Sequence, residues 1–220
     1  MDQAEKKQQV ANAAAEMVES GIKLGVGSGS TVNLFIDAMA RRGRAPAALV
    51  ASSRETERRL RVAGFQVSEL GDVGDLDLYV DGADEANKNF QLVKGGGGAL
   101  TREKIVAAAS RRFVCIIDDS KWVAVLGQFP LPVEVIPMAQ SYVARQMVRQ
   151  RGQPILRKGF VTDNGNVILD VHSLAIENPV ELETRINQIA GVVTVGLFAQ
   201  RPADVILMAG DSGIKRLERR

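Results

Sequence analysis

Short apolar runs alternate with longer amphipathic segments over the first 120 residues. Runs such as "IKLGVG" (22–27) have the length of buried strands, whereas the segments between them are rich in helix formers and end at glycine. Strands that alternate with helices predict an α/β protein with a mostly parallel sheet and helices on both faces. The expected strands are 22–27, 48–53, 75–82 and 113–119, and the expected helices are 3–20, 28–43, 54–64 and 99–112.

The pattern changes near Gly127, where "GQFPLPVEVIP" contains three prolines and is typical of a linker or edge segment. The order of elements after it is β-α-β-β-α-β, the ferredoxin-like motif. Asn164-Gly165 is a strong hairpin signal between its second and third strands. The expected strands are 132–136, 154–161, 167–173 and 192–198, and the expected helices are 138–152 and 179–191.

The last residues predict one more buried strand (204–210), followed by a short polar helix, "DSGIKRLERR". Both resemble the first part of the chain more than the second. We therefore expect a larger α/β domain formed by residues 1–128 and 202–220, with a smaller α+β domain, 129–201, inserted before its final strand.

Composition narrows the functional classes. The chain has 220 residues, of which 45% are apolar and 25% charged, the balance of an ordinary soluble globular protein. A net charge of +2 gives no strong field toward nucleic acid or membrane. The basic runs at 41–44 and 58–61 have no interleaved aromatic residues, so we expect solvated helix faces there. Neither nucleic acid nor membrane is an expected partner.

Cysteine and histidine each occur once. Cys115 lies in an apolar run and cannot form a disulfide within the chain, which fits a reducing compartment. Because His172 is the only histidine, the sequence argues against a histidine-based zinc site and against a Ser-His-Asp triad. The sequence also has no signal-peptide-like apolar segment at its start and no membrane-spanning run. We expect a cytoplasmic location and no metal.

The first candidate site is "GVGSGST", Gly25–Thr31, between a strand and a helix. Glycine lets the backbone approach a ligand, and amides at a helix start favour an anion. Val32 stands where a dinucleotide fingerprint has its third glycine, and no P-loop lysine follows. We predict a phosphate cradle, with a serine-capped tight turn as the alternative. Ser28, Ser30 and Thr31 add hydroxyl donors to this turn.

The second candidate is "DGADEANKNFQLVKGGGGAL", residues 81–100. Asp81 and Asp84 lie at the C-terminal end of the strand expected at 75–82, and ligands of open parallel sheets bind at the carboxyl ends of the strands. Lys94 precedes four glycines, and Glu103 falls in the first turn of the next helix. Consecutive glycines are entropically costly unless the backbone lines a pocket or adopts positive φ. The alternative is a flexible surface loop with solvated acids.

The third candidate is "DDSK", Asp118–Lys121, which follows the strand expected at 113–119 and so reaches the same edge of the sheet. Lys121 can hold an anion there, and a capping serine with a solvated lysine is an equally good interpretation. Three loops at one edge are stronger evidence than any one of them. A carboxylate that moves a proton beside a carbonyl, with cations nearby, suits isomerisation of a sugar phosphate, as one option among several.

Five motifs, "GVGSGST", "DGADE", "LVKGGGGALTREKIV", "DDSK" and "LPVEVIPMA", together resemble ribose-5-phosphate isomerase of the A type, over nearly the whole chain. The resemblance implies an aldose–ketose isomerase of the pentose phosphate pathway. It would interconvert D-ribose 5-phosphate and D-ribulose 5-phosphate through an enediolate, without metal or other cofactor. The resemblance also implies a Rossmann-like domain, a ferredoxin-like domain, and a homodimer or higher homo-oligomer.

The resemblance assigns roles by motif position. Glu103 would be the base, Lys94 would stabilise the enediolate, and Asp81 and Asp84 would handle hydroxyl protons and help to open the sugar ring. Ser28 stands where the family often has threonine, and "GGGGAL" has one glycine more than some members. The residues implied in substrate binding are Lys7, Gly27, Ser28, Gly29, Ser30, Thr31, Gly95, Gly96, Gly97 and Lys121.

Other interpretations stay open. A Schiff base through Lys94 and a metal-assisted hydride shift with Asp81 and Asp84 as ligands are alternative mechanisms. A sugar-phosphate sensor on a related fold would bind without turnover, although it would not require the full acid–base set. An acyl-CoA transferase would use Glu103 as a nucleophile, but the sequence carries no strong CoA-binding signal.

Overall fold

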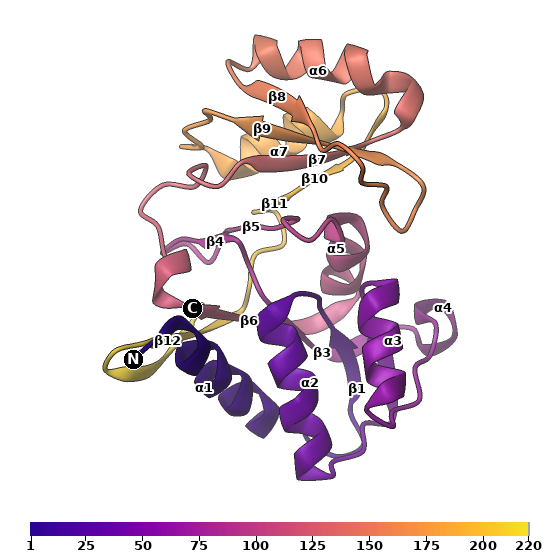
Figure 1. Cartoon of the computed structure of the whole chain (residues 1–220), viewed down its shortest axis with the longest axis vertical. Helices are drawn as coiled ribbons and strands as arrows, with labels where there is room; N and C mark the ends of the chain where they lie inside the picture. Colours follow the sequence, from indigo (N-terminus) through magenta and orange to yellow (C-terminus); the bar gives the residue numbers. More distant parts are fainter. Residues whose placement is uncertain (220) are drawn as a thin grey trace. The chain divides into compact units, whose positions relative to one another are not determined.

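The chain folds into two compact units, shown in a computed structural model that describes residues 1–219 (Figure 1). The first unit comprises Met1–Ala83, Arg102–Trp122 and the segment that begins at Ala203. The second comprises Asp84–Thr101 and Val123–Pro202. This grouping places the glycine-rich segment in the second unit. The domain boundaries expected from the sequence, 1–128 with 202–220 and 129–201, stay a prediction about which segments fold on their own.

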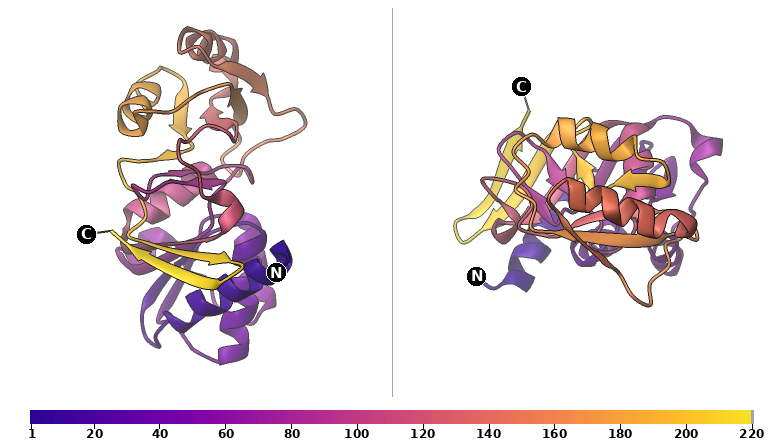
Figure 2. Two further views of the ribbon diagram at one scale, coloured as in Figure 1. Left: turned by 90° about the vertical axis from the view of Figure 1, so that its left-hand side faces the viewer. Right: turned by 90° about the horizontal axis from the view of Figure 1, so that it is seen from above.

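The first unit is built on a six-stranded sheet with the order β13-β12-β6-β3-β1-β2. Five strands are parallel, and β13 pairs antiparallel with β12 at one edge, where the yellow hairpin is clear in Figure 2. The chain order reverses at β1, so the topological switch point lies between β1 and β3. The strands are β1 (Lys23–Val26), β2 (Ala48–Ala51), β3 (Leu76–Asp81), β6 (Ser110–Asp118), β12 (Val205–Gly210) and β13 (Gly213–Glu218).

Helices cover both faces of this sheet, which confirms the predicted α/β class. Leu24 and Val26 of β1 belong to the core shared with α1 and α2, two helices that lie side by side in Figure 1. Gly25, between them, faces Val106 of α5 on the other side. The helices are α1 (Gln3–Glu16), α2 (Ser30–Arg42), α3 (Arg54–Val62), α4 (Leu70–Val73) and α5 (Leu100–Ala108), with a 3₁₀ turn η1 (Asp119–Lys121).

The prediction of a short polar helix after residue 210 is wrong. The segment is strand β13, joined to β12 by a tight turn in which Gly210 faces Gly213 and Gly213 has φ 106°. A solvated edge strand tolerates charged side chains such as Lys215 and Arg216. The segment therefore lacks the apolar run that marks a buried strand in the sequence.

Several predicted helices are too long, most clearly two in the first unit. The helix expected at 3–20 ends at Glu16, and the helix expected at 99–112 ends at Ala108. Ser110 and Arg112 instead pair with β3 and extend β6 toward its N-terminus. In both segments, residues that favour helices continue past the last helical residue. The sequence alone therefore does not show where each helix ends.

The second unit contains a four-stranded antiparallel sheet with the order β10-β7-β9-β8. Its last strand lies beside its first, which is the ferredoxin-like arrangement predicted. Val143, Met147 and Ile186, from the two helices, share one core with the strands. The elements are β7 (Leu131–Val135), η2 (Pro137–Ala139), α6 (Gln140–Arg149), β8 (Gln153–Leu156), β9 (Val167–His172), α7 (Pro179–Asn187) and β10 (Val192–Val195).

A small three-stranded sheet, β11-β5-β4, also belongs to the second unit and is absent from the sequence prediction. It consists of β4 (Glu85–Ala86), β5 (Leu92–Val93) and β11 (Leu197–Phe198). The single strand expected at 192–198 is therefore wrong, because the chain changes sheets at Gly196. The strand expected at 154–161 stops at Leu156. Two-residue strands are too short to leave a periodic pattern.

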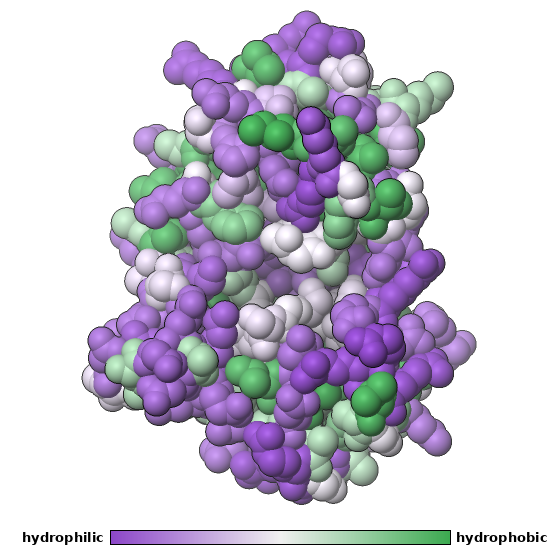
Figure 3. All heavy atoms as spheres, viewed as in Figure 1, coloured by the Kyte–Doolittle hydropathy of each residue, from purple (hydrophilic) through white to green (hydrophobic). Residues whose placement is uncertain are grey.

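Within the described part of the chain, no helix has the length and apolar composition needed to cross a membrane. Hydrophilic side chains cover most of the surface in the view of Figure 3, and the hydrophobic ones lie in small separate groups.

Candidate active site

The predicted anion-binding turn lies at the switch point of the first unit's sheet. After β1, the Gly27 amide donates to the Val80 carbonyl at 2.9 Å, and the Ser28 amide donates to Asp81 Oδ1 at 3.0 Å. These bonds tie the turn to the end of β3. Ser28 and Asp81, expected from the sequence to share one edge of the sheet, are therefore in direct contact.

Asp81 is fully buried, and its carboxylate is held from several sides. Oδ1 also accepts from the Gly82 amide at 2.7 Å, and Oδ2 accepts from the Tyr79 hydroxyl. A Cβ atom on Gly27 would lie 2.0 Å from Asp81 Cγ. Glycine at position 27 is therefore required for the carboxylate to approach the turn.

Glu103 joins this cluster from the first turn of α5. Its side chain is buried, with 4% exposed, and Oε1 accepts from the Ser28 hydroxyl at 2.5 Å. Gly25 makes room for α5, because a Cβ atom there would lie 2.6 Å from Val106 Cγ1. The structure thus brings together Ser28, Asp81 and Glu103, as predicted from loops far apart in sequence.

Tyr79 is a member of the cluster that the sequence analysis missed. It lies two residues before Asp81, so both side chains point to the same face of β3. Burial, and then the nearby carboxylates of Asp81 and Glu103, hold the pKa of the Tyr79 hydroxyl well above its usual range. It therefore stays a hydrogen-bond donor to Asp81. The two-residue spacing on a strand was the available signal.

Two of the predicted cationic site residues, Lys7 and Lys121, belong to the first unit. Lys7 Nζ donates to Ser30 Oγ at 3.2 Å, so α1 contributes an ammonium group to the start of α2. That start has Gly29 as its N-cap, no side-chain cap and no acidic residue in its first turn, which suits an anion. Thr31 lies in the same turn. Lys121 is half-buried in η1, after β6, and has no hydrogen-bond or ion-pair partner within residues 1–219.

In the second unit, Lys94 follows β5 and is almost fully buried. Its amide donates to the Gly196 carbonyl at 2.8 Å, and its ammonium nitrogen lies 5.5 Å from the centre of the Phe198 ring, a cation–π distance. Asp84 accepts from the Gly96 amide at 2.8 Å. Lys94, Asp84 and the glycine run therefore form one local structure. That they share a site with the Glu103 cluster stays a prediction.

The glycine run is an ordered turn. Gly95 and Gly98 have φ angles of 113° and 81°, and the Gly98 amide donates to the Gly95 carbonyl at 2.9 Å. A Cβ atom on Gly96 would lie 2.6 Å from Asp84 Oδ1. Gly97 alone has open space around it. Positive φ and close approach, the reasons anticipated from the sequence, therefore account for most of the run.

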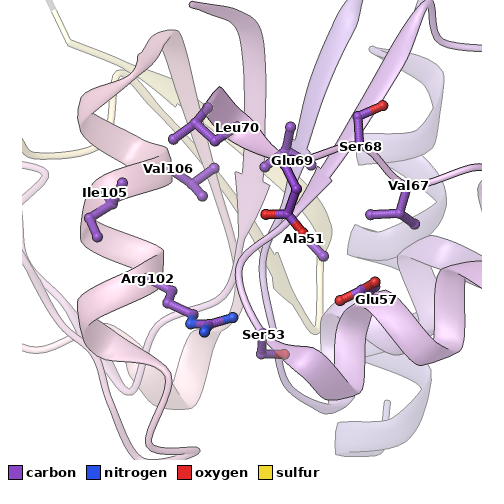
Figure 4. Close-up of a pocket in the computed structure, with 11 residues that line it drawn as sticks. Ala51, Ser53, Glu57, Val67, Ser68, Glu69, Leu70, Arg102, Ile105 and Val106 are labelled. Carbon is purple, nitrogen blue, oxygen red and sulfur yellow. The ribbon is translucent and has the colours of Figure 1, made fainter. Parts of the chain in front are cut away.

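A separate cavity of about 170 Å³ lies in the first unit between α5, α3 and the segment before α4 (Figure 4). Arg102 of α5 points toward Ser53 and Glu57, and Glu69 enters from the facing segment. None of the residues that line it is a predicted site residue. Among residues 1–219, no group of three or more histidine, cysteine or acidic side chains is arranged to hold a metal ion.

A buried acid–base cluster at the switch point of a parallel sheet, beside a helix N-terminus without a side-chain cap, defines an α/β enzyme that acts on a small anionic substrate. Comparison with known proteins identifies the family. Residues 48–213 match the model of the family described as ribose 5-phosphate isomerase A (phosphoriboisomerase A).

Three solved structures illustrate the likeness. Ribose 5-phosphate isomerase A of Neisseria gonorrhoeae is 44% identical, with a TM-score of 0.97, over 99% of this chain and 97% of that one. The enzyme of Methanocaldococcus jannaschii is 36% identical, with a TM-score of 0.94, over 99% and 100%. A D-ribose-5-phosphate isomerase in complex with phospho-erythronic acid is 33% identical, with a TM-score of 0.96, over the whole of both chains.

The chain belongs to the ribose 5-phosphate isomerase A family. It is an isomerase of the pentose phosphate pathway that interconverts ribose 5-phosphate and ribulose 5-phosphate. This outcome confirms the family resemblance and the predicted activity. The alternative interpretations of the chain as a sugar-phosphate sensor or an acyl-CoA transferase are therefore set aside.

Proposed function

We propose that the isomerisation proceeds by carboxylate-mediated proton transfer through an enediolate, without metal or other cofactor. The observation that carries the proposal is Glu103, a buried carboxylate beside Ser28 and Asp81 at the switch point of the sheet. A base that moves one proton between C1 and C2 needs a fixed carboxylate shielded from water. Glu103 meets that requirement.

The charge that develops on the enediolate oxygens needs a cation or donors in place before reaction. In the proposal this is the role of Lys94, whose ammonium group is already desolvated against Phe198. Asp81 and Asp84 transfer the hydroxyl protons and assist opening of the furanose ring. Both carboxylates accept backbone amide hydrogen bonds that fix their orientation.

The phosphate of the substrate binds at the start of α2. Backbone amides of the first helical turn are free of intrahelical partners and carry the positive end of the helix dipole. Lys7 adds a positive charge to this place through its contact with Ser30. The residues proposed to bind substrate are Lys7, Gly27, Ser28, Gly29, Ser30, Thr31, Gly95, Gly96, Gly97 and Lys121.

The relative that holds phospho-erythronic acid supports the same chemistry. That ligand combines a phosphate with a planar, anionic carboxylate, which has the shape and charge of an enediolate. A site complementary to this ligand needs positive charge or hydrogen-bond donors at both ends. We expect this chain to bind the same acid tightly.

Glu103→Gln tests the assignment of the base. We expect kcat to fall by about 10³-fold, because general base catalysis is lost, while sugar-phosphate binding survives. Kinetics and calorimetric titration with phospho-erythronic acid measure the two quantities. Glu177→Gln, at an exposed glutamate, is the matched control with unchanged kcat. Unchanged turnover in the Glu103 variant would remove this residue from the role.

Two alternative mechanisms have direct tests. A Schiff base on Lys94 predicts that borohydride traps substrate on the protein, whereas the enediolate mechanism predicts no trapping. A metal-assisted hydride shift through Asp81 and Asp84 predicts loss of activity in a strong chelator. Full activity under those conditions is the result that our proposal requires.

We further propose a homodimer or higher homo-oligomer in the cytoplasm. The second unit exposes apolar side chains around α6, including Met138, which is 96% exposed, and Ile136. Exposed apolar residues gathered on one element are typical of a protein interface. Sedimentation measures the assembly, and a monomer at all concentrations would contradict it. Cell fractionation checks the location.

A further inference from the structure

We propose that Arg157, oriented by Asp170, is a positioning residue that holds the glycine run and, through it, Asp84. The inference rests on the proposed role of Asp84 in the isomerisation. It concerns only side chains of the second unit. Neither Arg157 nor Asp170 belongs to the motifs that identified the site.

Arg157 follows β8 and is bound on two edges of its guanidinium group. Nε donates to Asp170 Oδ2 at 2.8 Å and Nη2 donates to Asp170 Oδ1 at 2.5 Å. Nη1 donates to the carbonyl oxygens of Gly95 at 3.0 Å and Gly96 at 3.1 Å. Only 18% of the Arg157 side chain is exposed. A planar fork with five donors suits this simultaneous binding.

One peptide unit connects Arg157 to Asp84. The Gly95 carbonyl and the Gly96 amide belong to the same trans peptide, so they point in opposite directions. Arg157 holds the carbonyl, and Asp84 Oδ2 accepts from the amide at 2.8 Å. The plane of this peptide is therefore fixed from both sides. If Arg157 releases the carbonyl, the peptide can rotate and Asp84 loses the donor that orients it.

The same connection between β8 and β9 fixes the end of the run. The Phe160 ring lies 5.4 Å from the Arg157 guanidinium carbon, and a Cβ atom on Gly98 would lie 2.1 Å from Phe160 Cζ. Residues 157 and 160 thus contact the start and the end of the turn. Neither contact would be needed if the run were only a flexible link.

Charge is not the function of Arg157 in this arrangement. Asp170 forms a two-point ion pair with it, so the pair adds little net charge to the neighbourhood. The geometry of the fork is what matters. Arg157→Lys keeps the charge but cannot bind Asp170 and two carbonyls together, so we expect it to be nearly as impaired as Arg157→Gln.

The test is a double-mutant cycle with Asp84. We expect Arg157→Gln to lower kcat by about 10-fold in the wild-type background with KM little changed, because a misplaced group costs rate rather than phosphate binding. In the Asp84→Ala background the same change should lower kcat by less than about 2-fold, since the group it positions is gone. Arg149→Gln, at an exposed arginine of α6, is the control with wild-type kcat.

Each outcome decides the matter. Equal losses in both backgrounds would show that Arg157 acts on the fold in general and would overturn the inference. Full activity of Arg157→Lys would overturn it as well. Asp84→Ala alone reports the proposed function separately: unchanged kcat there removes Asp84 from the chemistry and the inference with it. If Arg157→Gln does not fold, as judged by circular dichroism, Asp170→Asn replaces it in the cycle with the same expectations.

Discussion

The two glycine-rich segments of the candidate site use glycine for different reasons. In β1 and the turn after it, Gly25 and Gly27 leave room for two buried neighbours, Val106 of α5 and the Asp81 carboxylate at the end of β3. In the run that begins at Gly95, positive φ angles make a turn that is then held by side chains from the connection between β8 and β9. The first segment is held by the core, and the second depends on a few hydrogen bonds.

That difference predicts unequal sensitivity to added side chains. A group pressed against a buried sheet cannot relax, because protein interiors are close-packed. A turn held by hydrogen bonds can shift by a few tenths of an ångström. Substitutions at comparable glycines in the two segments therefore measure how rigid each segment is.

Gly27→Ala should have the largest effect. The new methyl group would lie 2.0 Å from Asp81 Cγ, so Asp81 must move. We expect kcat to fall by at least about 100-fold and the free energy of unfolding by about 2 kcal/mol. Steady-state kinetics and urea unfolding measure both. Gly71→Ala, with no atom within 4 Å of the new Cβ, is the control. A fully active Gly27→Ala enzyme would show that Asp81 is not fixed.

Gly96→Ala should have a smaller effect of the same kind. The new methyl group would lie 2.6 Å from Asp84 Oδ1, but Asp84 is only half-buried and can turn away. We expect kcat to fall by about 10-fold with little loss of stability. The same assays apply. A loss as large as that of Gly27→Ala would contradict the proposed contrast between the two segments.

Glu134→Gln tests a buried hydrogen-bond network in the second unit. This buried carboxylate on β7 accepts from Thr162 Oγ1 at 2.8 Å, Asn166 Nδ2 at 2.8 Å and Asn164 Nδ2 at 3.1 Å, and from the Thr101 hydroxyl. An amide adds donors where only acceptors fit, so we expect a loss of about 1 kcal/mol in stability. Urea unfolding measures it. Wild-type stability would show that the network carries little free energy.

Tyr79 predicts an effect that is confined to alkaline pH and is absent at neutral pH. Its folded pKa is raised above the unfolded value, so its contribution to stability is complete below about pH 10 and is lost as pH rises further. Above about pH 10, the free energy of unfolding should therefore decrease less steeply with pH in Tyr79→Phe than in the wild type. The difference in slope should be up to about 1.4 kcal/mol per pH unit. Tyr142→Phe, at an exposed tyrosine, is the control. An unchanged slope in Tyr79→Phe would contradict this.

The sequence predicted the side chains proposed to do chemistry better than the side chains that hold them. Ser28, Asp81 and Glu103 lie at strand and helix ends, where a parallel sheet gathers its loops, so their meeting could be foreseen. Arg157 and Asp170 lie 62 residues or more beyond Gly95 in an ordinary hairpin, and only the folded register of β8 and β9 reveals their role. The small β11-β5-β4 sheet and the edge strand β13 were not predicted, for the same reason. Their pairing is tertiary, and their segments are short or solvated.

The central claim is that a buried carboxylate moves a proton between C1 and C2 of the sugar phosphate. The most direct measurement is an NMR time course of ribose 5-phosphate in deuterated water, with the purified protein in a strong chelator. We predict that ribulose 5-phosphate forms and that deuterium from the solvent enters the transferred position. Conversion that stops in the chelator, and that without it proceeds with no deuterium incorporated, would contradict proton transfer by Glu103.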